Sequence, residues 1–177
     1  MRVISGKYKG RRLTGNKIFN ARPTTDFARE SLFNILNNYF YFDQIKVLDL
    51  FSGTGSISFE FVSRGCKNVE MVENDAKNFK FICGAIKELN IENLKTIKGD
   101  AFWFLEKCLP GYDIIFADPP YDLKGIEDLP MKVFERNLLK DDGWFILEHS
   151  KSYHFNEHPN FKEERKYGAV HFSIFMK

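Results

Sequence analysis

The motif Asp118-Pro119-Pro120-Tyr121 stands directly after the apolar run 114–117, so it lies at the end of a predicted buried strand. The two prolines fix the backbone and aim carbonyl oxygens into a cleft, while Asp118 adds a carboxylate and Tyr121 a flat ring. Such acceptors hold the two hydrogens of a planar exocyclic amine, and a base that carries the amine can stack on the ring for about 1 to 3 kcal/mol. We expect these four residues to be catalytic. A rigid loop without chemistry is the alternative.

A second motif, Asp49-Leu50-Phe51-Ser52-Gly53-Thr54-Gly55, joins an apolar strand to a predicted helix. Ligands of open parallel sheets bind at such strand ends, and glycines let a ligand touch the backbone. A dinucleotide fold is the obvious competitor, but its fingerprint has a third Gly or Ala where this chain has Ser58. Asp49 would repel a pyrophosphate and attract an ammonium group, such as that of S-adenosylmethionine. We therefore predict S-adenosylmethionine as the cofactor, bound by Asp49, Phe51, Ser52, Gly53, Thr54 and Gly55; a purely structural turn is the alternative.

Two further acids complete the predicted cofactor site. Glu73, in Val72-Glu73-Asn74-Asp75, ends the second strand, where a carboxylate can accept both ribose hydroxyls of an adenosine. For Asp75 we prefer a helix-capping role. Asp100, in Gly99-Asp100-Ala101, can accept the adenine amino group, although an N-cap is an equal alternative. The remaining predicted cofactor-binding residues are Glu73, Asn74, Asp100, Ala101 and Asp118.

Alternating strand and helix patterns must position these motifs, and they predict an α/β fold with a mostly parallel sheet covered on both faces. The last two apolar runs have no helix between them and turn at Tyr167-Gly168, which predicts an antiparallel closing hairpin and seven strands in all. The predicted strands span residues 46–50, 68–72, 94–98, 112–117, 144–148, 161–166 and 169–176. The predicted helices span residues 56–64, 75–89, 102–108 and 131–139.

The first part of the chain is different in character. Short extended pieces around Val3-Ile4 and Arg12-Leu13 are separated by glycines, which predicts a small β-hairpin. Apolar positions from Phe27 to Phe40 then recur at helical spacing behind Pro23 and Thr25 or Asp26. We expect residues 1–42 to form an N-terminal extension packed on a main domain of residues 43–177.

This extension is also basic. Residues 1–30 hold eight Lys or Arg and two acids, a charge of +6, whereas the other 147 residues carry 18 basic and 22 acidic side chains, a charge of −4. Phosphate contacts with Lys and Arg gain from counterion release, so a polyanion is the expected partner, and a merely solvated basic end is the alternative. The candidate RNA-binding residues are Arg2, Lys7, Lys9, Arg11, Arg12, Arg22 and Arg29.

Length and composition limit the number of domains and the kinds of site that the chain can form. At 177 residues the chain fits one folded domain with one active site. No run of about 20 apolar residues and no secretory signal is present, so we expect a cytoplasmic protein without membrane contact. The cysteines and histidines lack disulfide or metal spacing, and we expect no metal. They are Cys66, Cys83, Cys108, His149, His154, His158 and His171.

The chain resembles the RsmD family, the 16S rRNA (guanine-N2) methyltransferases, within the class I methyltransferases. The resemblance covers nearly the whole chain and is most specific in the N-terminal motifs. It implies a Rossmann-like fold, S-adenosylmethionine, and a target equivalent to guanine 966 of 16S rRNA in a partly assembled 30S subunit. The matching motifs are Met1-Arg2-Val3-Ile4-Ser5-Gly6, Lys9-Gly10-Arg11-Arg12-Leu13, Arg22-Pro23-Thr24-Thr25-Asp26, Arg29-Glu30-Ser31-Leu32-Phe33-Asn34-Ile35-Leu36, Asp49 to Gly55, Asp118 to Tyr121, and Tyr167-Gly168.

The resulting hypothesis is that RNA docks on the basic extension, the target guanine leaves its stack, and Tyr121 receives it while Asp118 assists transfer of the methyl group to N2. The same amine motif would also suit adenine N6 in DNA or a glutamine amide in a protein. The chain has no spare length for a DNA-recognition domain, and the basic extension argues against a protein target. A non-enzymatic RNA-binding assembly module is a further alternative, which the intact acids Asp49, Glu73, Asp100 and Asp118 disfavour.

Overall fold

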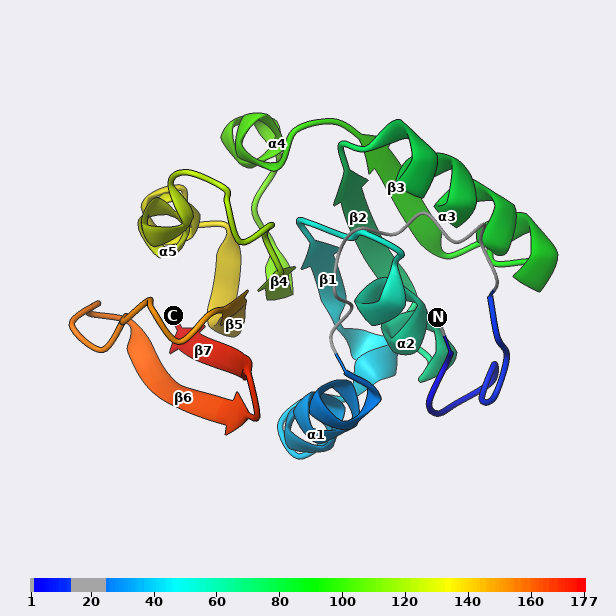
Figure 1. The fold of residues 1–177 in the computed structure, drawn as a ribbon, viewed down its shortest axis with the longest axis horizontal. Helices are drawn as coiled ribbons and strands as arrows, with labels where there is room; N and C mark the ends of the chain where they lie inside the picture. The colour runs from blue at the N-terminus through cyan, green and yellow to red at the C-terminus, as the bar shows by residue number, and fades with distance from the viewer. Residues whose placement is uncertain (1, 14–24) are drawn as a thin grey trace.

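A seven-stranded mixed sheet forms the centre of the molecule (Figure 1). The structure is a computed structural model and describes residues 2–13 and 25–177. The strand order is β3-β2-β1-β4-β5-β7-β6; β1 to β5 run parallel, and β7 is antiparallel to both β5 and β6. The α/β class and the closing hairpin predicted from the sequence are confirmed. The strands are β1 (Lys46–Asp49), β2 (Asn68–Glu73), β3 (Leu94–Lys98), β4 (Tyr112–Ala117), β5 (Leu139–His149), β6 (Phe161–Tyr167) and β7 (Val170–Met176).

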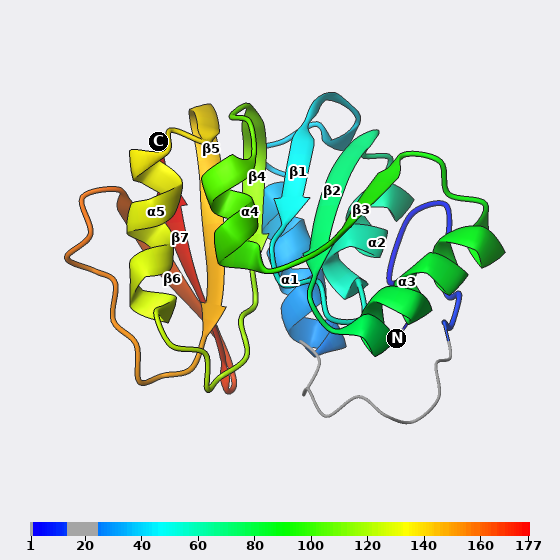
Figure 2. The same cartoon turned by 90° about the horizontal axis from the view of Figure 1, so that it is seen from above.

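Helices cover both faces of the sheet, because the strands β1, β4 and β5 bury side chains on both sides. Side chains from α1, α2 and α3 form one core cluster, and side chains from α4 and α5 form the other. Figures 1 and 2 show α4 and α5 across the sheet from α1 and α2. The helices are α1 (Asp26–Leu36), α2 (Ser56–Ser63), α3 (Ala76–Leu89), α4 (Ala101–Lys107) and α5 (Leu129–Glu135), with short 3₁₀ turns η1 (Phe42–Gln44) and η2 (Ile126–Asp128).

The order of the strands reverses between β1 and β4. The chain builds outward from β1 to β3 and then returns to place β4 on the other side of β1. Loops that leave the carboxyl ends of β1 and β4 therefore depart toward opposite faces of the sheet, and ligands of open parallel sheets bind at such a reversal. Both motifs with the strongest chemical signal, Asp49 to Gly55 and Asp118 to Tyr121, follow these two strands.

The largest difference from the predicted boundaries lies between α5 and β5. Residue Leu139 was predicted to end the helix, but α5 stops at Glu135 because Asn137 takes a left-handed conformation with φ 50°. Leu139 instead begins β5, where it pairs with Tyr112 of β4. The strand is therefore longer than the predicted residues 144–148, since pairing with β4, a long-range contact, decides where it starts.

The N-terminal extension shares the core of the main domain. Its two extended pieces pair as the predicted hairpin would, through one antiparallel bridge between Arg2 and Arg12 and a hydrogen bond of 3.0 Å from the Val3 amide to the Arg11 carbonyl, although within the described residues this pairing is too short to count as strands. Leu13 is 2% exposed and belongs to the same cluster as α1 and the sheet. Helix α1 ends at Leu36, short of the predicted Phe40. Pro23 and Arg22 lie outside the described residues.

Within residues 2–13 and 25–177, no helix has both the length and the apolar composition needed to cross a membrane. The same residues contain no group of three or more His, Cys, Asp or Glu side chains placed to hold a metal ion.

Candidate active site

Asp49 ends β1 and is the most unusual buried group of the site. It is 1% exposed, and its Oδ2 accepts a hydrogen bond of 2.7 Å from the Ser58 hydroxyl, whereas Oδ1 has no hydrogen-bond partner within the described part of the chain. Burial raises the pKa of Asp49 to about 7, against the lowering effect of the Ser58 hydrogen bond. A buried carboxylate oxygen without a partner is costly unless a ligand supplies a donor. This atom fits the ammonium group of the predicted cofactor.

The loop after Asp49 is fastened to the neighbouring strand. The Ser52 amide donates to the Val72 carbonyl at 3.0 Å, and the Ser52 hydroxyl donates to the same oxygen at 2.9 Å. Its two glycines have left-handed backbones but different surroundings. A Cβ on Gly55 would lie 2.7 Å from the Phe59 ring, whereas a Cβ on Gly53 would meet no described atom within 4 Å. Gly55 is therefore needed for packing, and Gly53 is the position that leaves backbone open to a ligand.

Glu73, at the end of β2, comes beside this loop. It is 8% exposed and accepts a 2.6 Å hydrogen bond from the amide of Asp75, and the Gly53 amide also faces its carboxylate. Burial raises the pKa of Glu73, and these backbone donors oppose the shift. The structure thus brings the predicted ribose acid and the glycine loop together. Asp75 caps α3 by accepting from the amides of residues 77 and 78, as predicted, and Asn74 is exposed.

Asp100 lies farther along the same edge and has a structural task. Its Oδ1 accepts from the Trp103 amide at 2.9 Å and caps α4, so the capping alternative is what the structure describes. Asp100 is exposed, which leaves its other oxygen accessible, while the side chain of Ala101 is buried in the core. Phe51 approaches Phe102 edge-on, with 6.4 Å between ring centroids, and links the glycine loop to α4.

The motif Asp118 to Tyr121 leaves β4 at the point of strand reversal. Asp118 is half-buried, Pro119 is buried, and Tyr121 is 56% exposed, which leaves the predicted stacking ring accessible. The Pro120 carbonyl accepts a 2.9 Å hydrogen bond from the Leu123 amide. One of the carbonyl oxygens predicted to accept from the substrate amine is therefore already used within the turn. The motif is thereby held rigid at the edge of the site.

Two residues of this region were missed by the sequence reasoning. Ser58, which argued against a dinucleotide fold, holds Asp49 in place. Glu148 is 3% exposed and follows Leu147, the partner of Ala117, so the parallel register places it beside Asp118 across β4 and β5. The signal was present in the sequence, because Glu148 is an acid directly after an apolar run, residues 144–147, as Asp49 and Asp118 are acids after apolar runs.

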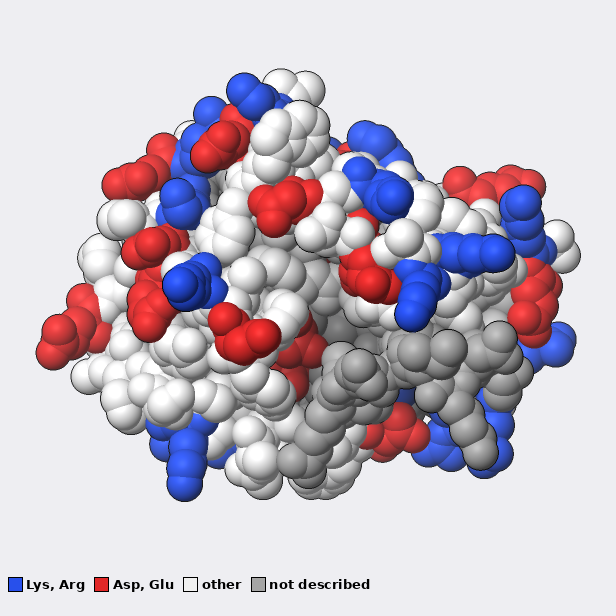
Figure 3. All heavy atoms as spheres, turned by 45° about the horizontal axis from the view of Figure 1, so that its top comes forward, with Lys and Arg blue, Asp and Glu red and all other residues white. Residues whose placement is uncertain are grey.

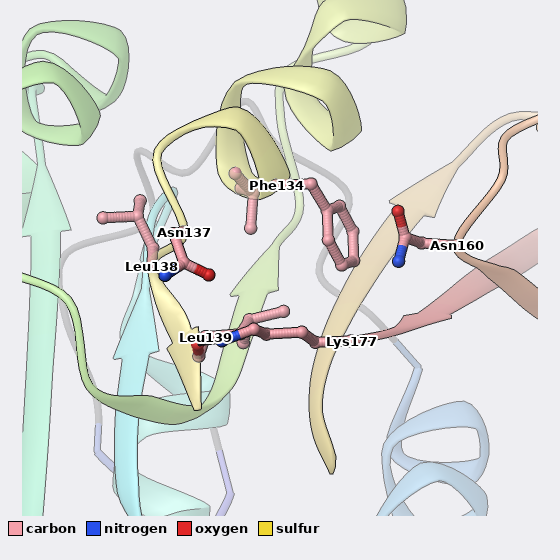
Figure 4. Close-up of a pocket in the computed structure, with 7 residues that line it drawn as sticks. Phe134, Asn137, Leu138, Leu139, Asn160 and Lys177 are labelled. Atoms are coloured by element: carbon pink, nitrogen blue, oxygen red, sulfur yellow. Dashed lines mark hydrogen bonds between the residues drawn. The ribbon is translucent and has the colours of Figure 1, made fainter. Parts of the chain in front are cut away.

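The molecular surface is hollowed on the face onto which the strand ends open (Figure 3). In Figure 3 the hollow lies near the centre of this face, with acidic side chains on its margin. A separate cavity of about 230 Å³ lies elsewhere, between the end of α5, the start of β5 and the residue after β7 (Figure 4). It is lined by Phe134, Leu139 and Lys177, among others, and lies at the opposite end of the strands from the predicted site. It contains none of the predicted site residues.

The predicted RNA-binding residues divide into two groups. Lys7, Lys9, Arg11 and Arg12 are exposed, and Arg2 is exposed but pairs with Asp26 at 2.9 Å. Arg29 is 2% exposed, and its guanidinium donates to the Arg2 carbonyl and to Asp26. In this structure Arg29 fastens the N-terminal segment to α1 and does not face solvent. Arg22 lies outside the described residues.

Comparison with known proteins places the chain in a family. The family described as "Conserved hypothetical protein 95" matches residues 1–176. "Ribosomal RNA small subunit methyltransferase D" of Buchnera aphidicola subsp. Baizongia pistaciae is 32% identical over 99% of this chain and 91% of that protein. The chain belongs to the RsmD family. A second RsmD relative, of the same printed name, from Escherichia coli (strain K12), is 31% identical over 84% of this chain and 71% of its own length.

Solved structures agree with this membership. The structure of yhhF from Escherichia coli has a TM-score of 0.87 at 25% identity and covers 100% of this chain and 97% of its own. A Salinibacter ruber RNA methyltransferase, solved with S-adenosyl-L-homocysteine, has a TM-score of 0.66 at 14% identity, over 88% of this chain and 93% of its own, and shows the shared fold alone. RsmD proteins are S-adenosylmethionine-dependent methyltransferases, so the predicted cofactor is confirmed for the family.

Proposed function

We propose that this chain transfers a methyl group from S-adenosylmethionine to the N2 amine of a guanine in small-subunit ribosomal RNA, at the position equivalent to guanine 966. The observation that carries the proposal is the convergence of Asp49, Glu73 and Asp118 at the reversal of strand order. The names of the relatives, ribosomal RNA small subunit methyltransferases, support the choice of RNA over DNA or protein.

Each acid has a distinct task in this proposal. Oδ1 of Asp49, which has no partner within residues 2–13 and 25–177, accepts from the cofactor ammonium, and Glu73 accepts from the ribose hydroxyls. Bound there, the cofactor supplies an electrophilic methyl group. Asp118 accepts a hydrogen bond from the guanine amine and takes up its proton, at least in part, as the methyl group is transferred, which concentrates electron density on a nitrogen that is otherwise a poor nucleophile. Tyr121 provides the exposed ring on which the unstacked base rests.

The basic extension supplies the RNA contacts. Lys7, Lys9, Arg11 and Arg12 are exposed and belong to the segment whose charge of +6 contrasts with the acidic remainder of the chain. We assign residues 1–42 to RNA binding and residues 43–177 to methyl transfer. The substrate that we propose is a partly assembled 30S subunit, in which the target guanine is still accessible.

A labelled-methyl assay tests the reaction and its substrate together. Small subunits from a strain that lacks the enzyme, unmethylated DNA and a mixture of bacterial proteins are each incubated with the chain and labelled S-adenosylmethionine. We expect label in the ribosomal RNA, and mass spectrometry of digested RNA should place it on guanine N2. Label on adenine N6 or on glutamine, or no label anywhere, contradicts the proposal.

The variant Asp118→Ala tests the role of the amine motif. We expect turnover to fall by roughly 10² to 10⁴-fold, the range for loss of a positioned proton acceptor, while cofactor affinity stays within a few-fold. Calorimetry with S-adenosylmethionine provides the fold control. Unchanged turnover refutes the assignment.

The double variant Arg11→Glu, Arg12→Glu tests the basic extension. Since each lost phosphate contact reduces the dependence of affinity on salt, we expect weaker RNA binding and a shallower slope of log affinity against log salt. Equal affinity to the wild type across a salt series contradicts the RNA-binding role.

A further inference from the structure

The N-terminal segment, residues 2–13, is docked on helix α2 through a buried carboxylate. Glu60 is 0% exposed and accepts hydrogen bonds from the amides of Ile4 at 2.8 Å and Ser5 at 3.0 Å. Arg64, the C-cap residue of α2, donates to the same carboxylate at 2.8 Å. Charge-assisted bonds of this kind are stronger than neutral ones, so Glu60 fixes the start of the segment.

Ser63 makes a second attachment with both its backbone and its side chain. Its carbonyl accepts from the Lys7 amide at 2.7 Å, and its hydroxyl accepts from the Tyr8 amide at 2.9 Å and donates to the Ser5 carbonyl. The turn between the two attachments therefore lies flat against the end of α2.

The approach is so close that only glycine fits at the centre of the turn. Gly6 has φ +78°, and a Cβ built on it would lie 1.9 Å from the Ser63 carbonyl oxygen, which is backbone and cannot move aside. Gly10, in the same segment, has φ +80°, but a Cβ there would meet no described atom within 4 Å. The two glycines thus share the same backbone requirement, and only Gly6 is needed for docking.

Docking fixes the position of the cations relative to the cofactor site. The exposed Lys7 and Lys9 follow the attached turn directly. Helix α2 begins just after the glycine loop, and its Ser58 bonds to Asp49, while Glu60 and Ser63 on the same helix hold the N-terminal segment. One short helix therefore connects the predicted methyl-donor site to the predicted RNA contacts.

We infer that Glu60 and Ser63 are positioning residues that hold residues 2–13 as a preformed cationic surface for the RNA backbone, at a fixed distance from the methyl-donor site. The inference rests on the proposed function. A surface that is already ordered loses less conformational entropy when RNA binds, and a fixed distance places the target nucleotide for reaction. A flexible basic tail with the same charge would provide neither advantage.

The matched variants Gly6→Ala and Gly10→Ala test this inference, since both keep every charge and both strain a left-handed glycine. Binding is measured with a labelled fragment of small-subunit ribosomal RNA over a salt series, and KM and kcat with unmethylated small subunits. For Gly6→Ala we expect RNA affinity to fall at least tenfold, KM to rise by a similar factor, and the salt slope to become shallower. For Gly10→Ala we expect values within about threefold of the wild type.

Two further measurements keep the test decisive. S-adenosylmethionine affinity within about twofold of wild type shows that Gly6→Ala is folded, and amide hydrogen exchange should show lost protection at Ile4, Ser5, Lys7 and Tyr8. If Gly6→Ala does not fold, Ser63→Ala replaces it, with a smaller change in the same directions.

The outcomes separate this inference from the proposed function. If the wild type methylates small subunits and the undocked variant binds RNA as well as Gly10→Ala does, the inference is overturned and the function stands. If exchange shows the segment undocked already in the wild type, the inference also fails. If the wild type neither binds nor methylates the RNA, both are wrong.

Discussion

Helix α2 bonds to one buried carboxylate, Asp49, through Ser58 in its first turn and carries a second, Glu60, in its own sequence, and the two carboxylates differ in their partners. Glu60 is 0% exposed, and both of its oxygens accept from donors of the chain itself. Asp49 is 1% exposed, yet one of its oxygens has no hydrogen-bond partner among the described residues. Burial is the same at both sites, so burial alone does not distinguish a ligand site from a structural one.

The two carboxylates differ in whether the chain itself supplies every hydrogen-bond donor that they need. A buried acid whose donors are all in the chain stabilises the fold, whereas a buried acid with an empty acceptor position lowers stability until a ligand fills it. The first arrangement predicts an effect on folding when the acid is changed, and the second predicts an effect on binding.

Of the variants that test this comparison, Asp49→Asn should produce the largest effect. Because it removes the charge that attracts the cofactor ammonium, we expect S-adenosylmethionine affinity to fall by roughly 10 to 100-fold, which corresponds to the loss of one charge-assisted hydrogen bond. The free energy of unfolding should stay level or rise at pH 8, since an ionised group no longer has to be buried. Calorimetric titration and urea unfolding measure the two quantities, and a loss of stability with full affinity would reverse the assignment of Asp49.

The dependence of stability and of cofactor affinity on pH provides a second test of Asp49. Since the pKa of Asp49 is about 7 in the folded chain against an ordinary value of 3.8, the folded state keeps a proton over this interval that the unfolded state has lost. This contribution to stability is present below about pH 4 and is lost as pH rises through 7. Cofactor affinity should change in the opposite sense, and fall as pH drops below about 7. Titrations from pH 5.5 to 8.5 should give a sloping profile for the wild type and a flatter one for Asp49→Asn.

Glu60→Gln should affect folding and spare the cofactor. The amide nitrogen of glutamine would face backbone amides that need an acceptor, so we expect the free energy of unfolding to fall by about 1 to 3 kcal/mol. Urea unfolding measures this change. Cofactor affinity within about twofold of wild type is the expected control result, and a large loss of affinity would mean that the tasks of Glu60 and Asp49 are not separable.

Ser58→Ala should produce the smallest effect. The Ser58 hydrogen bond lowers the pKa of Asp49, so its removal raises that pKa further and leaves less of the charged form at pH 7. We expect cofactor affinity to fall about threefold to tenfold at pH 7 and to recover in part at pH 8.5. Equal losses at both pH values would show that Ser58 acts through packing and not through the charge of Asp49.

Local patterns predicted much of this arrangement. β4 spans the predicted residues 112–117, and Asp75 caps α3 as expected, because an apolar run and a capping side chain act over a few residues. The boundary at Leu139 was wrong since pairing with Tyr112, far away in the sequence, overrides helical spacing. The burial of Arg29 could not be foreseen either, because its guanidinium is held by the Arg2 carbonyl, a contact between distant residues.

By itself, the sequence determined the α/β alternation, the acids at the strand ends and the basic charge of the N-terminus, because these depend on residue type and short spacing. Only the tertiary structure decided which acids lie side by side, that Glu60 is fully paired while Asp49 is not, and that the first residues dock on α2. Hydrogen-bond satisfaction depends on which donors the whole fold brings within about 3 Å, and no local pattern contains that information.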